Sequence, residues 1–416
     1  MSWRMRSGQS WGRLVMMFDE STLYYVKSDI EGIRRTLFDL ASWKNGLAFK
    51  KIDFSEKGRP VIKIAELNNG ISANTSFTEG DYGEEVYIRW DDLLFSWSGN
   101  PQTSIDVFRY RLQDGWLNQH IFKVTANEEL IKKDFLYYVL KLLKPRFTQI
   151  ATNKQTTGLG HVTIADLKRI SLIIPSKDKQ DLIVSILKAL DDKIELNNRI
   201  NDNLLEQLFS LYQNACTVVI KNVTLGSLCS FQEGYVNPAQ THPEYFDGDI
   251  KWLRAVDINE SFIIETSRTL TYAGFQSAKK SAYLFPPNTI AISKSGTIGR
   301  LGIVADYMCG NRAVINIKPN DQALLPFIYA YLKSKQREFP ELAVGSVQKN
   351  LYVSLLEPLF VSIPDTNTLT QFCNTGNALL NLMKNNCEEN IRLASIRDVL
   401  LPRLMSGKLD VSEVEL

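Results

Sequence analysis

Two stretches of the chain carry hydrophobic residues in alternating steps of three and four, the seam pattern of a coiled coil. Each stretch follows a short apolar run that stops at a proline, Pro175 or Pro364. The first seam consists of Leu187, Leu190, Ile194, Asn197, Asn201, Leu204, Leu208 and Leu211. The second consists of Leu379, Met383, Asn386, Asn390, Leu393 and Leu400. The pattern predicts two long helices, over residues 177–215 and 366–404.

A pair of asparagines interrupts each seam near its middle. A buried asparagine in a seam fixes the register of a coiled coil at a cost in stability. If the two helices run antiparallel and side by side, the asparagines meet and satisfy one another's hydrogen bonds; the alternative is that they face solvent. The second seam departs from the pattern at Gly376, which costs a helix interior about 1 kcal/mol relative to alanine, and at Arg397.

Segments rich in β-branched and aromatic residues precede each long helix and are separated by Gly, Asn and Pro, which is typical of short strands. In the first half they are VIKIAEL, EEVYIRW and DLLFSW, and in the second half IKWLRAV, NTIAIS, LGIVAD and AVINIK. A shorter helix is predicted after the central strands of each half, at 132–143 and 324–335. We therefore expect an α+β domain ahead of each long helix.

The two halves of the chain also match each other in sequence. TLFDLASWKNG at 36–46 and TLGSLCSFQEG at 224–234 share Thr, two Leu, Ser and Gly, with Trp43 opposite Phe231. IKIAELN then matches LRAVDIN, LFSWSGN matches AISKSGT, and Asn118 matches Asn311, all in the same order. Small drifts in offset indicate two diverged copies rather than coincidental strand patterning. A tandem repeat is predicted over about residues 36–215 and 224–404.

Composition indicates a folded protein of several domains. The 416 residues are 44% apolar and 23% charged, and a prior of about 150 residues per domain predicts two to four units. The five cysteines have no CxxC spacing and the chain has three histidines, so a structural zinc site has few ligands available. No apolar run reaches the roughly 20 residues that span a bilayer. We expect reduced thiols and a cytoplasmic protein.

The formal net charge of +2 does not by itself indicate nucleic-acid binding. The sequence also lacks a phosphate-binding G-x-x-x-x-G-K-[ST] loop, an H-E-x-x-H metal helix and a G-x-S-x-G nucleophile elbow. The glycines of KSGTIGRLG at 294–302 do not follow the G-x-G-x-x-G order of a dinucleotide site. These absences argue against an enzyme.

The doubled organisation and four segments together resemble the specificity subunit of type I restriction-modification systems. The segments are TTGLGHVTIADLKRISLIIP, GSVQKNLYVSLLEPLFVSIP, KIELNNRINDNLLEQLFSLY and LLPRLMSGKLDV. The resemblance covers about residues 36–410. It implies an α+β fold with two target recognition domains in tandem repeat, joined and separated by two long antiparallel coiled-coil helices. In that family each recognition domain reads one half of a bipartite DNA sequence.

The resemblance implies partners as well as domains. We expect double-stranded DNA, two modification (methyltransferase) subunits docked on the helices, restriction subunits in the full complex, and no membrane. Catalysis, with its S-adenosylmethionine, ATP and Mg, would belong to the partner chains, so none of these is expected here. The expected domains are an N-terminal segment of unclear role at 1–35, recognition domain 1 at 36–176, the central spacer helix at 177–215, recognition domain 2 at 220–365, the C-terminal spacer helix at 366–404 and a tail at 405–416.

Base edges are read by polar and basic side chains, so loop residues of these types are the predicted DNA contacts. In the first copy they are Ser96, Trp97, Ser98, Asn118, Gln119, His120, Lys154, Gln155, Thr157 and His161. In the second copy they are Lys294, Ser295, Thr297, Arg300, Asn311, Arg312, Ser346, Gln348, Lys349 and Asn350. Each of them is also consistent with a solvated loop residue. The basic stretch KLLKPRF at 141–147 fits either a phosphate contact or a solvated helix end.

Two other functions remain open from the sequence. One is a self-sufficient DNA methyltransferase or nuclease, which requires a cofactor or metal site. The other is a coiled-coil scaffold that joins partner proteins without reading DNA. Under the favoured interpretation, helices of about 30 residues span roughly 45 Å, which is about 13 base pairs. Two unlike copies at that separation predict a target with two unlike halves.

Overall fold

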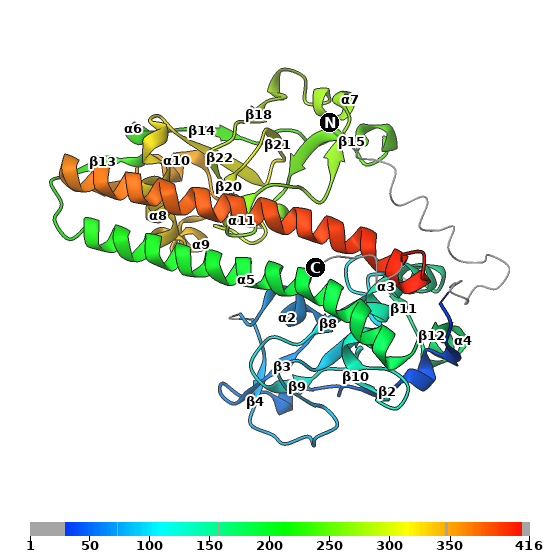
Figure 1. The fold of residues 1–416 in the computed structure, drawn as a ribbon. Helices are drawn as coiled ribbons and strands as arrows, with labels where there is room; N and C mark the ends of the chain where they lie inside the picture. The colour runs from blue at the N-terminus through cyan, green and yellow to red at the C-terminus, as the bar shows by residue number, and fades with distance from the viewer. Residues whose placement is uncertain (1–29, 73, 156–157, 346–347, 410–416) are drawn as a thin grey trace. The chain divides into compact units, whose positions relative to one another are not determined.

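The computed structural model describes residues 30–409 except 73, 156–157 and 346–347. The chain forms two compact units (Figure 1). Unit 1 contains the chain up to Asp191 together with Ser395 onward, and unit 2 contains Asp192–Ala394. Within the described ranges, no helix combines the length and hydrophobicity needed to cross a membrane.

Unit 1 is built on two four-stranded sheets. The first has the order β2-β10-β6-β8, from β2 (Ala41–Asn45), β6 (Leu93–Ser96), β8 (Asp106–Arg109) and β10 (Ile121–Ala126). The second has the order β4-β3-β9-β5, from β3 (Arg59–Ile62), β4 (Phe77–Thr78), β5 (Tyr87–Ile88) and β9 (Gly115–Leu117). Two antiparallel pairs complete it, β1 (Ile33–Thr36) with β12 (Ser171–Ile174), and β7 (Ser98–Gly99) with β11 (Gly160–His161).

The helices of unit 1 are α2 (Ile64–Asn69), α3 (Lys133–Asn153), α4 (Ile164–Arg169) and the first part of α5 (Lys177–Ala215), with short η2 (Phe38–Leu40) and η3 (Lys51–Asp53). Helix α3 and the first part of α5 contribute to the core of the first sheet, whereas α2 lies beside β3 of the second sheet. Phe95 of β6 and Phe147 of α3 are completely buried, with ring centroids 4.8 Å apart. Burial of large side chains of this kind contributes about 1.5–3 kcal/mol each, and it holds α3 on the sheet.

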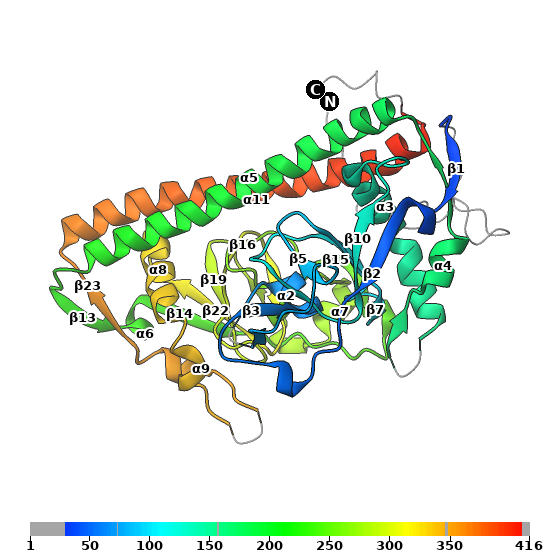
Figure 2. The same cartoon turned by 90° about the horizontal axis from the view of Figure 1, so that it is seen from below.

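Unit 2 has a five-stranded and a four-stranded sheet. The first has the order β14-β22-β19-β20-β16, from β14 (Cys229–Glu233), β16 (Phe262–Ile263), β19 (Thr289–Ser293), β20 (Leu301–Val304) and β22 (Val314–Pro319). The second has the order β17-β15-β21-β18, from β15 (Phe246–Leu253), β17 (Thr269–Leu270), β18 (Leu284–Phe285) and β21 (Met308–Gly310). Strand β13 (Lys221–Thr224) pairs with β23 (Phe360–Ile363) (Figure 2).

The helices of unit 2 are α6 (Leu225–Leu228), α7 (Tyr272–Gln276), α8 (Leu325–Lys335), α9 (Phe339–Leu342), α10 (Val353–Leu356) and most of α11 (Thr366–Ser406), with η4 (Pro243–Tyr245), η5 (Ala255–Asp257), η6 (Lys279–Ser281) and η7 (Gln322–Leu324). Helix α8 contributes to the core of the five-stranded sheet, whereas α7 packs on β15 and β17 of the four-stranded sheet. Gly376 of α11 lies where α11 meets α8 and α5. A Cβ atom there would lie 2.7 Å from Pro326 Cβ and 3.1 Å from Leu208 Cδ1, which explains the departure at this seam position.

The two units share one topology. In each, the outer strand pair joins the first and last strands (β1 with β12, β13 with β23), and the four-stranded sheet with a parallel central pair recurs (β3 with β9, β15 with β21). The main sheet of each unit also repeats the order first, last, middle strand. Two tandem domains of mixed helix and sheet, as the sequence repeat predicts, are therefore present.

Three sequence expectations differ from the structure. VIKIAEL is not one strand, because β3 ends at Ile62 and α2 begins at Ile64; IKWLRAV similarly leaves β15 for η5. In both units the residue before the turn donates its backbone N–H to a carboxylate three residues later in the chain: Lys63 to Glu66, and Arg254 to Asp257. This hydrogen bond caps the start of a helical turn.

The shorter helix of unit 1 extends to Asn153, past Pro145, although a proline removes a helical hydrogen bond. The buried side chains of Phe147 and Ile150 hold its last turns on the core.

The repeat also starts before residue 36. Strand β1 begins at Ile33 and corresponds to β13, so the end of the segment 1–35 has a counterpart; residues 1–29 lie outside the described residues.

Candidate functional site

In unit 1, three loops meet around Trp97, the residue that follows strand β6. The Trp97 N–H donates to the carbonyl of His120 at 3.1 Å, and the Trp97 carbonyl accepts from the Val162 N–H at 2.8 Å. The indole Nε1 donates to Asn45 Oδ1 at 2.8 Å. Backbone and side chain of Trp97 therefore tie together the ends of β2, β6, β10 and β11.

The structure brings several predicted contacts together here. The Trp97 and His120 rings lie 5.5 Å apart, and Ser98 pairs with His161 between β7 and β11. Gln119 and His120 are exposed in the turn after β9, and His120 adopts a φ of 78°. Ser96, in contrast, is completely buried. We therefore leave Ser96 out of the interface, whereas Trp97 is half-buried and its ring stacks on that of Phe122.

Lys154 has a structural partner that the sequence does not reveal. Its ammonium group donates to both carboxylate oxygens of Asp166, at 2.6 and 2.5 Å, and Asp166 is completely buried at the start of α4. Although burial alone raises the pKa of Asp166, the hydrogen bonds from Lys154 and Thr163 hold it below its ordinary value. The neighbouring Gln155 is exposed, and Thr157 lies outside the described residues.

In unit 2, Lys294 occupies the place of Trp97. Its N–H donates to the Ala313 carbonyl at 2.7 Å, and its carbonyl accepts from the Leu351 N–H at 2.9 Å. The ammonium group donates to Glu233 Oε2 at 3.0 Å and lies 4.7 Å from the centroid of the Tyr352 ring. The backbone connections of the two units are therefore the same, whereas the side chains differ.

We call these two equivalent sites the strand-end frames. Frame 1 consists of Asn45, Gly46, Trp97, Asn118–His120 and Val162. Frame 2 consists of Glu233, Gly234, Lys294, Asn311–Ala313 and Leu351.

The glycine of each frame is required by a close backbone approach. A Cβ atom on Gly46 would lie 2.1 Å from the Asn118 carbonyl oxygen, and one on Gly234 would lie 2.1 Å from that of Asn311. The N–H groups of Asn118 and Asn311 also have equivalent acceptors, the carbonyls of Ile62 and Leu253, at 3.0 and 2.9 Å. The two frames thus share backbone geometry in detail.

The other predicted contacts of unit 2 lie on neighbouring loops. Ser295, Thr297 and Arg300 belong to the β19–β20 turn, which Ser293 closes by accepting from the Arg300 N–H at 2.8 Å. Arg312 is exposed, and its N–H donates to Asn237 Oδ1 at 3.1 Å. Gln348 and Lys349 are exposed in the loop that a bridge between Val344 and Asn350 closes, and Ser346 lies outside the described residues.

Sequence reasoning missed Asn45 and Glu233. Both stand immediately before the glycine that the two copies share, at corresponding positions of TLFDLASWKNG and TLGSLCSFQEG. A difference at the end of an otherwise matching strand is the signal that marks them. Their partners lie 52 and 61 residues further along the chain, so the sequence does not show the pairing.

The central asparagines of the long helices contact one another within unit 2. Asn197 Nδ2 donates to Asn390 Oδ1 at 2.9 Å, and Asn386 Nδ2 donates to Asn201 Oδ1 at 2.8 Å. These partners occur in opposite order along the two helices. Asn197 and Asn201 are buried, 0% and 6% exposed, so the alternative that they face solvent is wrong for this pair.

The buried stripe of each helix drifts from the predicted seam. Leu187, Leu204, Leu208 and Met383 are buried, and Leu190, Ile194 and Leu393 are half-buried. Leu211 is 37% exposed while Tyr212 is 8% exposed. Similarly, Leu379 is only half-buried while its neighbour Leu380 is buried. A helix of 3.6 residues per turn drifts by about 20° per heptad against a 3.5 repeat, which moves the buried position by one residue.

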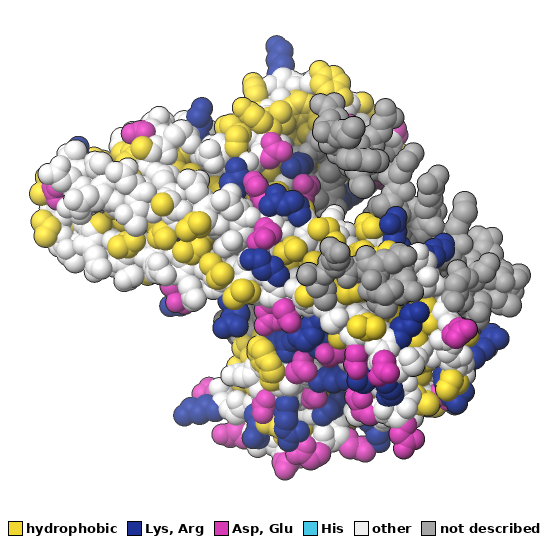
Figure 3. All heavy atoms as spheres, viewed as in Figure 1, with side chains coloured by type: hydrophobic (Ala, Val, Ile, Leu, Met, Phe, Trp, Pro, Cys, Tyr) yellow, Lys and Arg dark blue, Asp and Glu magenta, His cyan; other side chains and the backbone are white. Residues whose placement is uncertain are grey.

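Basic and acidic side chains are interspersed, and many of them form ion pairs within the described residues. On the face of unit 1 seen in Figure 3, Lys and Arg alternate with Asp and Glu and form no single basic surface. In the stretch at 141–147, Lys141 lies 3.1 Å from Asp106, Lys144 is hydrogen-bonded to the same carboxylate, and Arg146 is buried. This stretch therefore has a structural role in unit 1.

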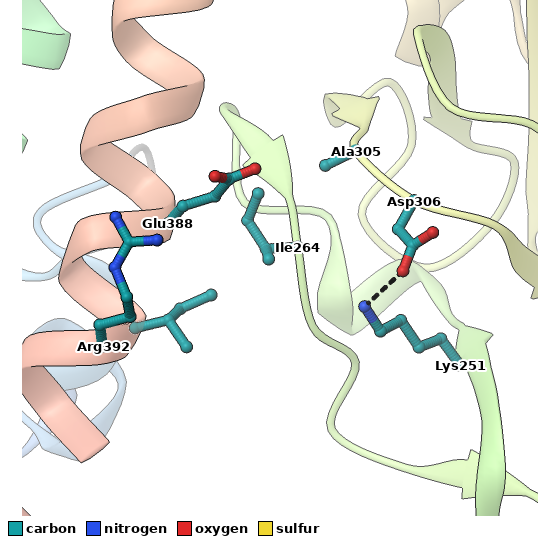
Figure 4. A pocket seen from close by; sticks show the side chains of 7 residues that line it. Lys251, Ile264, Ala305, Asp306, Glu388 and Arg392 are labelled. Atoms are coloured by element: carbon teal, nitrogen blue, oxygen red, sulfur yellow. Dashed lines mark hydrogen bonds and ion pairs between the residues drawn. The ribbon is translucent and has the colours of Figure 1, made fainter. Parts of the chain in front are cut away.

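A shallow hollow in unit 2 lies between α11 and the sheets. Glu388 and Arg392 of α11 face Ile264, and Lys251 is paired with Asp306 at 3.0 Å on the other side (Figure 4). Its lining has no nucleophile hydrogen-bonded to a base. Across the described ranges, no three His, Cys, Asp or Glu side chains are grouped to hold a metal ion.

Comparison with known proteins gives one consistent result. The family described as "Type I restriction modification DNA specificity domain" matches residues 33–206 and 218–383. The HindI specificity subunit of Haemophilus influenzae is 22% identical over 72% of this chain and 84% of its own length. The MjaIX specificity subunit of Methanocaldococcus jannaschii is 23% identical over 70% of this chain and 73% of its own length. A crystal structure of a type I S subunit from M. genitalium is 19% identical, covers 90% of this chain and 96% of its own, and gives a TM-score of 0.47.

Proposed function

The chain belongs to the family of type I restriction modification DNA specificity domains, and from this premise we propose that it is the non-catalytic DNA-recognition subunit of a type I restriction-modification complex. The observation that carries the proposal is the pair of strand-end frames. Two sites with the same backbone and different side chains suit a protein that reads two unlike half-sites with one scaffold.

In this proposal each unit reads one half of a bipartite, asymmetric target. The contacts in unit 1 are Trp97, Ser98, Asn118, Gln119, His120, Gln155 and His161. In unit 2 they are Lys294, Ser295, Thr297, Arg300, Asn311, Arg312, Gln348, Lys349 and Asn350. All of these belong to loops at strand or helix ends or, for Ser98 and His161, to the short strands β7 and β11, from which side chains can reach base edges while the sheets hold them in place.

The long helices act as the spacer between the two recognition domains and as the dock for two modification subunits. The asparagine contacts of unit 2 support an antiparallel coiled coil, with register set by polar pairs. Several apolar side chains remain exposed on the unit 2 part of these helices, among them Leu196, Ile200, Leu382 and Ile391. Exposed apolar side chains along a helix suit a protein partner.

The balance of charge fits a subunit that works inside a complex. With a formal net charge of +2, the positive and negative charges of the chain nearly balance, so it supplies little net positive charge for phosphates. Affinity for DNA depends strongly on phosphate neutralisation, so the partner subunits would supply most of it. We expect the isolated chain to bind DNA weakly. Tight binding by the isolated chain would contradict the assignment of phosphate neutralisation to the partner subunits.

Purification of the tagged chain from its native cells tests the proposal. Native mass should show two copies of one larger subunit bound to the chain, and methyl transfer to DNA should require that subunit. A chain that purifies alone and methylates or cuts DNA would instead be a self-sufficient enzyme. If partner proteins copurify but the complex shows no preference for any DNA sequence, the chain would be a scaffold.

A further inference from the structure

One hydrogen-bonded pair of side chains differs in chemistry between the two strand-end frames. In unit 1 the pair is Asn45 with Trp97, and in unit 2 it is Glu233 with Lys294. In each case the last residue of the first strand of the main sheet holds the residue that follows the central strand. The same two backbone positions therefore carry different hydrogen-bonding chemistry.

The pair in unit 2 presents a donor beside an acceptor. Lys294 donates to Glu233 Oε2 and lies against the Tyr352 ring, so its ammonium group is held from two sides. The side chains are 12% and 22% exposed, which limits the conformations that either can adopt. Fixed polar groups of this kind lose little conformational freedom on binding. An ammonium group has three donors, and the pair at 3.0 Å occupies one of them.

The chemistry of the pair matches one base pair. In the major groove, guanine offers the acceptors N7 and O6, and cytosine offers the N4 amino group beside them. Lysine donates to guanine O6 and N7, and glutamate accepts from cytosine N4. A lysine and a glutamate held side by side complement both edges at once.

In unit 1 the corresponding pair has a different capacity. Asn45 is exposed and its Oδ1 accepts from the Trp97 indole, so the donor that its side chain can offer is the uncharged Nδ2 amino group. Trp97 adds an aromatic surface beside His120. This pair lacks a carboxylate and an ammonium group, so it cannot reproduce the contacts of the pair in unit 2.

We propose that this side-chain pair is a specificity determinant in each unit, and that Glu233 with Lys294 reads a G·C base pair in the half-site of unit 2. The proposal rests on the function proposed above and adds to it the residues and the base pair. It predicts that exchanging the pair changes one position of one half-site and leaves the other half-site unchanged.

The experiment selects bound sequences from a pool of random duplex DNA, using the complete complex with its modification subunits. If the wild-type complex selects no defined sequence, the proposed function fails, irrespective of this inference. If it selects two half-sites, the variants E233Q and K294M are compared with it. We expect discrimination to fall roughly tenfold or more at one G·C position in one half-site, with the other half-site retained.

Two further variants separate recognition from folding. The exchange E233K with K294E keeps an ion pair in the frame and should alter the preferred base pair at the same position. The control K335M with E338Q removes a more exposed ion pair of 2.9 Å from the same unit and should leave both half-sites unchanged. Variants that melt earlier but select the wild-type sequence would show a purely structural ion pair and overturn the proposal. A change confined to an A·T position would overturn the G·C assignment.

Discussion

The carboxylate of Asp166 is completely buried and accepts from three donors. These are the ammonium group of Lys154, the Thr163 N–H and the Thr163 hydroxyl, at 2.5 to 2.7 Å. The arrangement joins the end of α3 to the start of α4, on either side of the loop that carries Gln155. One buried carboxylate thus fixes both ends of a loop that we assign to the DNA interface.

Replacing Asp166 by asparagine should destabilise unit 1 by about 1–3 kcal/mol, because the Lys154 ammonium loses its charged partner and a buried network is left incompletely bonded. Since the folded-state pKa of Asp166 is lowered, its stabilisation is fully present above the unfolded value of about 3.9 and is lost as the pH falls through the folded pKa. The free energy of unfolding of the wild type, measured with urea, should therefore decrease at acid pH, and D166N should show a smaller decrease. The exposed Glu56 provides the control E56Q, for which the wild-type pH dependence is expected.

The shared glycines support a second prediction at this scale. Alanine at Gly234 places a Cβ atom 2.1 Å from the Asn311 carbonyl oxygen, so the backbone must move; such overpacking costs about 1–3 kcal/mol. Thermal unfolding should show this loss for G234A. At Gly226 the nearest atoms lie at 3.3 Å, and G226A should lose clearly less. Equal losses in the two variants would mean that the close approach is not what the frame requires.

Sequence alone located the frames but not their internal contacts. Matching loops in the two copies identified Trp97 and Lys294 as candidates, because repeats reveal corresponding positions. Burial removed Ser96, and an ion pair accounts for Lys154; both effects depend on atoms distant in sequence. Asn45 and Glu233 were missed because their hydrogen-bond partners lie 52 and 61 residues further along the chain, and nothing in the matching segments marks either side chain as a partner.

At the scale of elements, the long helices combine apolar packing with polar layers. Leu204, Leu208 and Met383 are buried beside the hydrogen-bonded asparagines. The heptad pattern predicted both helices, whereas the drift from Leu211 to Tyr212 was not predicted, because a strict heptad ignores the 3.6-residue turn. Likewise, the β-branched residues of VIKIAEL at 61–67 suggested a strand, and the Glu66 carboxylate instead starts a helix within it.

The asparagine pair Asn201 and Asn386 should be strongly coupled. N386L removes the donor to Asn201 Oδ1 and leaves a buried polar group without that partner, which costs about 1–3 kcal/mol. The double variant N201L with N386L replaces both by apolar groups and should recover much of the loss. Urea unfolding of the two single variants and the double variant measures the coupling. N385L, at an exposed asparagine of the same helix, should have little effect, and additive losses in the pair would exclude the proposed coupling.

At the scale of the whole molecule, one topology occurs twice, with each copy followed by a long helix. The paired outer strands β1 with β12 and β13 with β23 close each copy at corresponding places. A duplicated scaffold allows one copy to change its reading side chains without altering the other. Strand β1 begins at Ile33, before the repeat boundary that the sequence predicts at residue 36. This strand, IRRT, is short and mostly polar, so it carries little sequence signal.

Shortening both helices by one heptad tests their role as a spacer. Removing residues 188–194 together with 394–400 deletes about 10 Å of helix and both members of the ion pair of 2.7 Å between Asp191 and Arg397. The complex should then select the same two half-sites with a gap shorter by about three base pairs. Retention of the wild-type gap would show that the helices do not set the distance.

The central claim is that two unlike units read two unlike halves of one DNA target. Selection of bound DNA by the complete complex, followed by sequencing of the selected pool, measures this most directly. The account predicts two different half-sites separated by a gap of fixed length and unspecified sequence. A palindromic site, a single uninterrupted site or no sequence preference would contradict it.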